Sequence, residues 1–278
     1  MLNRIMNMAN LSGVSEFRAE LRSGAAAYAY PCPMRMLYPD AIELVDPEVV
    51  YADLPHNDHR PSVRLNMIVS VDGGTSWEGV SGALGGPADK ALFPVLRSFA
   101  DVVLVAAGTM RAEHYGPAVL PATVQAVRRQ RGQTAVPPVA VVSRSCQLDW
   151  TSEFFTNATE RPLVITVTAA SAADRARAAE VADVVVAGER NVDFGLAIDE
   201  LGTRGARHVL AEGGPTLNGE LARARLLDEV CLTLSPRLAS GDAKRIISGS
   251  TLDELEALRL ESICEADDFL FLRYRPVR

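Results

Sequence analysis

The stretch HVLAEGGPTLNG, residues 208–219, carries the sharpest structural signal in this chain. It reads as a short strand, a Gly-Gly turn and a helix that carries Pro215 in its first turn. Two glycines let the backbone come close to a ligand, and the unpaired N–H groups at the start of the helix face that ligand. The stretch therefore predicts a strand-to-helix turn that can hold a pyrophosphate.

The same alternation of strand and helix extends outward from this turn. Short β-branched runs predict strands at 63–71, 102–107, 139–142, 163–167, 184–186 and 208–211. Amphipathic segments between them predict helices at 88–99, 122–131, 171–181, 193–203 and 217–224. Strands separated by such helices indicate βαβ crossovers and a largely parallel sheet with helices on both faces.

The last part of the chain departs from this alternation. Residues 229–235 and 269–274 are strand-like, and the segment between them reads as loop with one short helical stretch at 252–258. The prediction is an α/β fold with a mixed, mostly parallel central sheet that ends in an antiparallel C-terminal strand pair.

Residues 1–60 differ from the rest in pattern. Apolar residues recur at helical spacing from Leu11 to Leu21, and a stretch punctuated by proline follows. We interpret 1–60 as a variable N-terminal extension, a short helix and then an arm, with a loosely ordered tail as the alternative. Residues 61–278 contain no linker and read as one domain.

Composition narrows the class of protein. The 278 residues carry 35 acidic and 28 basic side chains, a formal charge of −7, which argues against a nucleic-acid binder. The four cysteines lie far apart and are expected to be reduced, and the longest apolar runs are too short to cross a membrane. No signal peptide is evident at the start of the sequence, so we expect a cytoplasmic protein.

Three more segments follow predicted strands, where ligands bind in α/β sheets. Asp72 ends the first strand beside two glycines, and this carboxylate could hold a polar edge of a substrate, act as a proton donor or simply form a turn. Thr109 can cap the helix that follows Gly108, and Arg111 adds a forked phosphate donor. Ser143 and Arg144 place a hydroxyl and a guanidinium group at the end of a predicted strand. They could bind a phosphate monoester or belong to a solvated loop. Neither a G-x-G-x-x-G fingerprint nor a Walker A loop occurs in the chain.

Together these segments resemble the pyrimidine-reductase family, the C-terminal reductase domain of the bifunctional riboflavin-biosynthesis deaminase/reductase and its stand-alone relatives. That family shares the dihydrofolate reductase fold. The resemblance covers roughly residues 61–275 and rests on five ordered segments: SVDG at 70–73, GTMRAE at 108–113, VSR at 142–144, EGGPTL at 212–217, and LDE at 227–229 with LTLSP at 232–236.

The resemblance implies an NADPH-dependent reductase domain at 61–278 that transfers hydride to the sugar C1 of a ribosylamino-pyrimidine phosphate, with a proton delivered alongside. It implies a catalytic role for Asp72 and a substrate contact for Ser81. Apart from the resemblance, His114 is expected close to Arg111 on the cleft side, where it could contact the substrate or be an exposed helix histidine. The residues that it implies for the cofactor are Gly108, Thr109, Arg111, Glu113, Ser143, Arg144, Glu212, Gly213, Gly214, Pro215, Thr216 and Leu217. Among these, Ser143 and Arg144 would lie near the 2′-phosphate and Glu212 by the nicotinamide ribose.

Two departures from the family pattern leave alternatives open. The zinc deaminase half, with its P-C-x-x-C, is absent, and His56 and His59 read as a solvated turn, so no metal is expected. Residues 113–121 replace the family's substrate segment. A pteridine or folate substrate and a catalytically silent nucleotide-binding protein are therefore alternatives. A deazaflavin cofactor is a further alternative, because a phosphate-binding pattern does not identify the redox ring. By analogy with the family we expect a homodimer formed through the C-terminal strands.

Overall fold

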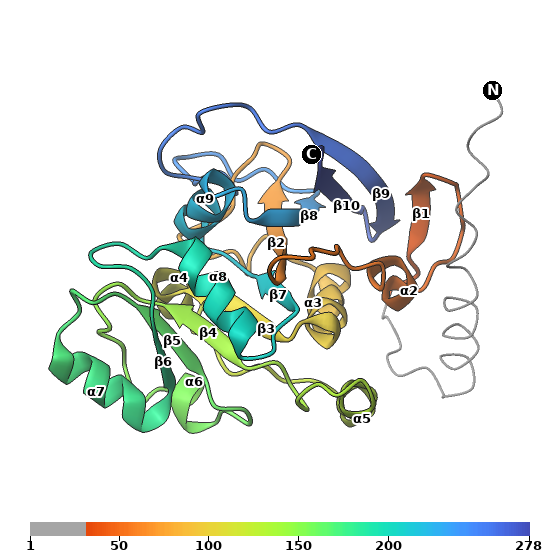
Figure 1. The fold of residues 1–278 in the computed structure, drawn as a ribbon. Helices are drawn as coiled ribbons and strands as arrows, with labels where there is room; N and C mark the ends of the chain where they lie inside the picture. Colours follow the sequence, from red (N-terminus) through yellow and green to blue (C-terminus); the bar gives the residue numbers. More distant parts are fainter. Residues whose placement is uncertain (1–31) are drawn as a thin grey trace.

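The computed structural model describes residues 32–278. Its centre is a ten-stranded sheet in the order β1-β9-β10-β8-β2-β7-β3-β4-β5-β6 (Figure 1). The strands are β1 (Arg35–Tyr38), β2 (Ser62–Ser70), β3 (Val102–Ala106), β4 (Val139–Val142), β5 (Leu163–Thr166), β6 (Asp183–Val186), β7 (His208–Ala211), β8 (Leu227–Ser235), β9 (Leu258–Ala266) and β10 (Phe269–Pro276).

The strands from β8 to β6 run parallel, whereas β8, β10, β9 and β1 pair antiparallel. The helices are α2 (Pro47–Tyr51), α3 (Pro87–Phe99), α4 (Ala107–Ala112), α5 (Ala122–Gln130), α6 (Glu153–Thr156), α7 (Ala172–Val181), α8 (Phe194–Thr203) and α9 (Pro215–Arg223). The predicted fold class, a mixed and mostly parallel sheet, is confirmed.

Alternation along the central strands builds two core layers. In β3, Val103 and Val105 face the layer that α3, α5 and α7 cover, and Leu104 faces the layer under α8 and α9. All three side chains are fully buried, as expected for a parallel strand with helices on both faces. Figure 1 shows these helices on the two sides of the sheet.

The C-terminal region corrects one prediction. The helix predicted at 252–258 is absent, and β9 occupies the segment that follows. Residues 261–266 alternate between half-buried and buried side chains, a period of two that is typical of a strand. The turn to β10 is made by Asp267 and Asp268, both at positive φ, a conformation that Asp tolerates in tight hairpins.

Residues 32–60 pack onto the sheet. β1 pairs antiparallel with β9, and Val50 and Tyr51 of α2 are buried against the layer under α3. Residues 1–31, which include the predicted helix at Leu11–Leu21, lie outside the described residues, and the domain boundary at residue 61 stays a prediction.

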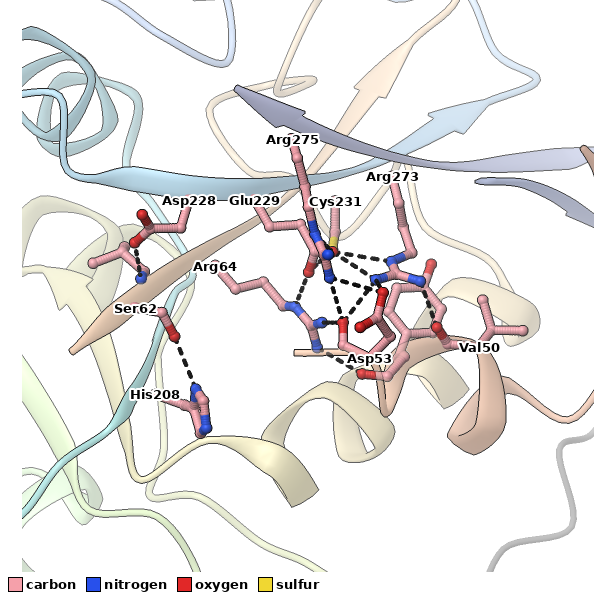
Figure 2. Close-up of polar contacts among 12 residues, drawn as sticks. Val50, Asp53, Ser62, Arg64, His208, Asp228, Glu229, Cys231, Arg273 and Arg275 are labelled. Atoms are coloured by element: carbon pink, nitrogen blue, oxygen red, sulfur yellow. Dashed lines mark hydrogen bonds and ion pairs between the residues drawn. The ribbon is translucent and has the colours of Figure 1, made fainter. Parts of the chain in front are cut away.

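A buried cluster of charge holds the segment after α2 in place (Figure 2). Glu229 at the start of β8 accepts hydrogen bonds from Arg64 on β2 and from Arg273 on β10, and Arg275 lies 3.4 Å from the same carboxylate. The three guanidinium groups also donate to the Asp53 carbonyl oxygen, at distances of 2.6 to 3.3 Å. One buried carboxylate therefore organises three arginines that bind the backbone of the N-terminal segment.

Candidate active site

The Gly213–Gly214 turn joins β7 to α9 at the carboxyl edge of the parallel strands. Two backbone hydrogen bonds tie it to β3, from the Glu212 N–H to the Leu104 oxygen (2.9 Å) and from the Ala106 N–H to the Gly213 oxygen (2.8 Å). Gly213 has a φ of 94°, which glycine adopts readily, and the peptide bond to Gly214 is cis. The predicted strand, turn and helix are therefore all present.

Gly214 allows the turn and α4 to come together. A Cβ atom at this position would lie 2.5 Å from the Thr109 Oγ1, well inside contact distance. The prediction that Thr109 caps the helix is wrong. α4 begins at Ala107, directly after β3, and has no side-chain cap. Thr109 instead lies inside the helix with its side chain against the glycine turn, so two of the predicted phosphate-binding segments meet.

A hollow of about 720 Å³ opens beside this junction. Its lining includes five of the residues that the sequence assigned to a cofactor: Gly108, Arg111, Arg144, Thr216 and Leu217. The remaining lining residues are Ala106, Val142, Asn191, Val192, Phe194, Glu220 and Arg223. The predicted residues Thr109, Ser143 and Pro215 are next to lining residues in sequence and are not part of the lining. Gly213 and Gly214 are also outside it.

Sequence reasoning missed the contribution of the loop after β6. The Asn191 Oδ1 accepts a 3.4 Å hydrogen bond from Arg144, and Val192 and Phe194 supply an apolar wall. This loop follows the carboxyl end of a parallel strand, so the rule that identified the other segments would also have identified it.

Arg223 on α9 supports binding of an anion in the hollow. Its Nη1 pairs with Glu220 at 2.7 Å, while its Nε and Nη2 are buried and have no hydrogen-bond partner among the described residues. Arg223 therefore adds a third guanidinium group to a hollow that also contains Arg111 and Arg144, and this positive charge fits a phosphate group, while the buried Nε and Nη2 atoms are themselves closed to solvent.

Asp72, predicted as catalytic, is engaged with the loop after β8. Its carboxylate accepts hydrogen bonds from the Ser70 hydroxyl (2.5 Å) and from the N–H groups of Ala239 (3.0 Å) and Ser240 (2.7 Å). These bonds lower the pKa of Asp72 to about 2, with the Ser70 bond the largest cause. Asp72 is therefore a carboxylate at neutral pH, which argues against a proton donor and leaves a role in binding.

The predicted substrate residues Ser81 and His114 lie around the end of α4, together with Glu113, which was predicted for the cofactor. The Glu113 Oε1 accepts a 2.6 Å hydrogen bond from the Ser81 N–H, which joins two predicted site residues. His114 is exposed and has a φ of 48°. Glu212 does not line the hollow: its side chain is 1% exposed and pairs with Arg97 of α3 at 2.7 Å.

Three further observations concern metals, membranes and the cysteines. Within residues 32–278 no three His, Cys, Asp or Glu side chains come together as metal ligands, and His56 is exposed and bonds to Asp58 at 2.8 Å. The described helices are too short or too polar to cross a bilayer. All four cysteines are unpaired and buried.

Comparison with known proteins gives consistent results. Residues 61–270 match the family described as the RibD C-terminal domain. A relative from Methanothermobacter thermautotrophicus, named 2,5-diamino-6-ribosylamino-4(3H)-pyrimidinone 5′-phosphate reductase, is 33% identical over 73% of this chain and 91% of its own length. A protein of the same name from Aquifex aeolicus is 27% identical over 72% of this chain and 88% of its own.

Solved structures show the same fold. A pyrimidine reductase-like protein from Corynebacterium diphtheriae superposes with a TM-score of 0.73 and 28% identity, over 84% of this chain and all of that one. Acinetobacter baumannii RibD superposes with a TM-score of 0.63 at 20% identity, over 79% of this chain and 59% of its own. At that identity the likeness concerns the fold alone.

Proposed function

The chain belongs to the RibD C-terminal domain family, and from this premise we propose that it is an NADPH-dependent reductase of a ribosylamino-pyrimidine phosphate. Membership confirms the family resemblance drawn from the five sequence segments. It also makes the chain an oxidoreductase of the pyrimidine-reductase type, since the relatives are named as reductases. The exact substrate, the cofactor and the role of each residue belong to the proposal.

The close approach of Gly214 to Thr109 beside an arginine-lined hollow is the observation that carries the proposal. The glycine turn and the first turn of α9 would bind the pyrophosphate of the cofactor through backbone N–H groups. Arg144 and Arg223 would bind the 2′-phosphate that distinguishes NADPH from NADH. Phe194 and Leu217 would pack against apolar parts of the dinucleotide.

NADPH, when bound, would supply the hydride that reduces the sugar C1. The chain would hold the substrate against the donor and exclude water, which lowers the entropic cost of the reaction. Ser81, His114 and the Asp72 carboxylate would contact the substrate at the carboxyl edge of β2. The departure of residues 113–121 from the family pattern keeps a pteridine as the second candidate substrate.

Titration of the purified protein with NADPH and NADH at one salt concentration tests the cofactor. We expect Arg144→Met to weaken NADPH binding about 10- to 100-fold, the loss of one charge-assisted hydrogen bond, and to leave NADH binding unchanged. Arg177→Met, exposed on α7, is the matched control. Equal affinity of the parent for NADPH and NADH would contradict the assignment. No binding of either would leave the deazaflavin alternative.

Turnover then separates an enzyme from a silent nucleotide-binding protein. We expect NADPH oxidation with 2,5-diamino-6-ribosylamino-4(3H)-pyrimidinone 5′-phosphate and none with dihydrofolate. NADPH binding without oxidation on either compound would favour the silent binder. Such a biosynthetic reductase would work in the cytoplasm.

A homodimer is part of the proposal. Leu232 and Leu234 of β8 lie opposite Leu272 and Leu270 of β10, and all four are half-buried on one face of the sheet. Ile263 of β9 extends this apolar face. A second copy of the chain would cover it, and light scattering during size-exclusion chromatography should give twice the 29.9 kDa chain mass.

A further inference from the structure

Glu212, directly before the glycine turn, is the centre of a buried polar network. Arg97 binds both carboxylate oxygens, its Nε at 2.8 Å from Oε1 and its Nη2 at 2.7 Å from Oε2. The Tyr115 hydroxyl donates to the same Oε2 and lies 2.7 Å from the Arg97 Nη2. The guanidinium also lies over the rings of Phe93 and Tyr115, with centroid distances of 5.7 and 5.5 Å.

This network occupies the Glu212 carboxylate. Both oxygens accept hydrogen bonds from the protein, the charge is matched by Arg97, and the side chain is 1% exposed. A bidentate pair of this kind has fixed geometry. Glu212 is therefore a rigid internal anchor and does not present its carboxylate to a ligand.

Tyr115 brings the segment after α4 to that anchor. Its neighbour Glu113 is held from the other side, by the 2.6 Å bond from the Ser81 N–H. His114 lies between these two attachment points, exposed and at positive φ, a conformation that persists only where its surroundings impose it. One short segment thus connects the loop at residue 81, α3 and the end of β7.

We infer that Tyr115 is a positioning residue: its hydroxyl fixes residues 113–121 against the glycine turn through Glu212 and so sets the affinity for substrate. The inference rests on the proposed function, because it takes 113–121 as the substrate side of the site. Tyr115 acts through the orientation of its neighbours and takes no part in the chemistry.

The structure separates this role from cofactor binding. Tyr115→Phe removes the hydroxyl and leaves the bidentate Arg97–Glu212 pair, the aromatic ring and the backbone bonds of the glycine turn. Burial, together with the Glu212 carboxylate, raises the pKa of Tyr115 well above its usual range, so the hydroxyl keeps its proton and donates throughout the working pH range.

The first test is hydrogen–deuterium exchange on the protein alone. In Tyr115→Phe, peptides that cover 113–121 should exchange about tenfold faster, while peptides that cover β7 and the first turn of α9 keep the parent rate. Tyr38→Phe is the control, since Tyr38 is 42% exposed on β1. An unchanged exchange rate in 113–121 would overturn the inference. An equal rise of the exchange rate in β7 would overturn it as well.

The second test uses kinetics with the pyrimidine phosphate. We expect the KM for substrate to rise about tenfold, the loss of one hydrogen bond to a charged group, with kcat within about twofold of the parent and the dissociation constant of NADPH unchanged. A parallel loss of NADPH affinity would make Tyr115 part of the cofactor site instead. If the parent protein does not turn over this substrate, the proposed function fails, and the exchange experiment still decides whether Tyr115 holds the segment.

Discussion

Glu212 and Glu229 are both enclosed by arginine, but at opposite ends of the parallel strands. Glu229, near the start of β8, faces three guanidinium groups that also bind backbone carbonyls of the N-terminal segment (Figure 2). Glu212, just beyond β7, has one guanidinium and one phenol.

The number of partners explains what each carboxylate does. At the amino end, three arginines are held on the two strands that flank β8. Their donors are distributed between a carboxylate and carbonyl oxygens, so the arrangement fixes structure. At the carboxyl edge a single arginine neutralises the charge, and the remaining bond goes to a loop at the predicted substrate site. Buried charge is costly unless it is paired, so both clusters should respond strongly to loss of one partner.

The largest effect is expected from Glu229→Ala. It leaves Arg64 and Arg273 buried without a carboxylate and should lower the free energy of unfolding by about 3–5 kcal/mol. Urea denaturation at neutral pH measures the loss. A loss below about 1 kcal/mol, as typical of surface pairs, would show that the carbonyl bonds alone satisfy the arginines.

Asp89 shows what a buried carboxylate does without arginine. It is 5% exposed in the first turn of α3, its hydrogen-bond partner is Thr233, and burial raises its pKa from 3.8 to about 6. The folded state therefore binds a proton more tightly than the unfolded state. The resulting penalty on stability grows as the pH rises from 3.8 to 6 and is then constant.

Asp89→Asn removes that penalty. The substitution should raise the free energy of unfolding by up to about 3 kcal/mol above pH 6 and have little effect near pH 4, because the shift is worth about 1.4 kcal/mol per unit. Denaturation at several pH values, with Asp199→Asn on α8 as control, measures the difference. A gain of equal size at both pH values would not come from titration.

Glu212→Gln should have a smaller effect on stability than Glu229→Ala. The amide oxygen can still accept from the Arg97 Nη2 and the Tyr115 hydroxyl, but the amide NH2 then faces the Arg97 Nε–H and the charge is lost, so we expect a loss of about 1–3 kcal/mol. Glu200→Gln, in a surface pair with Arg204, is the control and should change stability by about 0.5 kcal/mol or less. If Glu212→Gln lowered the free energy of unfolding as much as Glu229→Ala, the two clusters would not differ in their contribution to stability.

The smallest effect is expected from Asp53→Ala. Its carboxylate lies 3.0 Å from Arg275 but is 67% exposed, and its backbone carbonyl, which receives the arginine bonds, remains. Thermal or urea denaturation should show a loss of about 0.5 kcal/mol or less. A larger loss would show that the Asp53 carboxylate, rather than its backbone carbonyl, holds the N-terminal segment in place.

Local patterns predicted the fold better than the site. The strand–turn–helix at 208–219 and the parallel βα pattern depend on neighbouring residues, and they were correct. β9 was missed because its β-branched content is low and the Asp267–Asp268 turn was not recognised as a hairpin signal. The sequence predicted Thr109 as an N-cap, but α4 starts directly after β3 and has no side-chain cap.

Contacts between residues that are far apart in the sequence could not be predicted. Glu212 meets Arg97 and Tyr115 across 115 and 97 positions, and Arg273 meets Asp53 across 220. No pattern within a single segment carries such contacts. The sequence therefore located Glu212 beside the turn correctly but could not show that its carboxylate is already occupied.

The position of β1 at the sheet edge has a consequence for synthesis on the ribosome. Arg35 and Glu265 pair across 230 positions, and the carbonyl oxygens at residues 50 and 53 receive bonds from Arg273 on β10. The segment that contains β1 and α2 is thus translated well before β9 and β10, which supply several of its partners. During elongation the parallel strands can assemble without it, and β1 can pair only after β9 has left the exit tunnel.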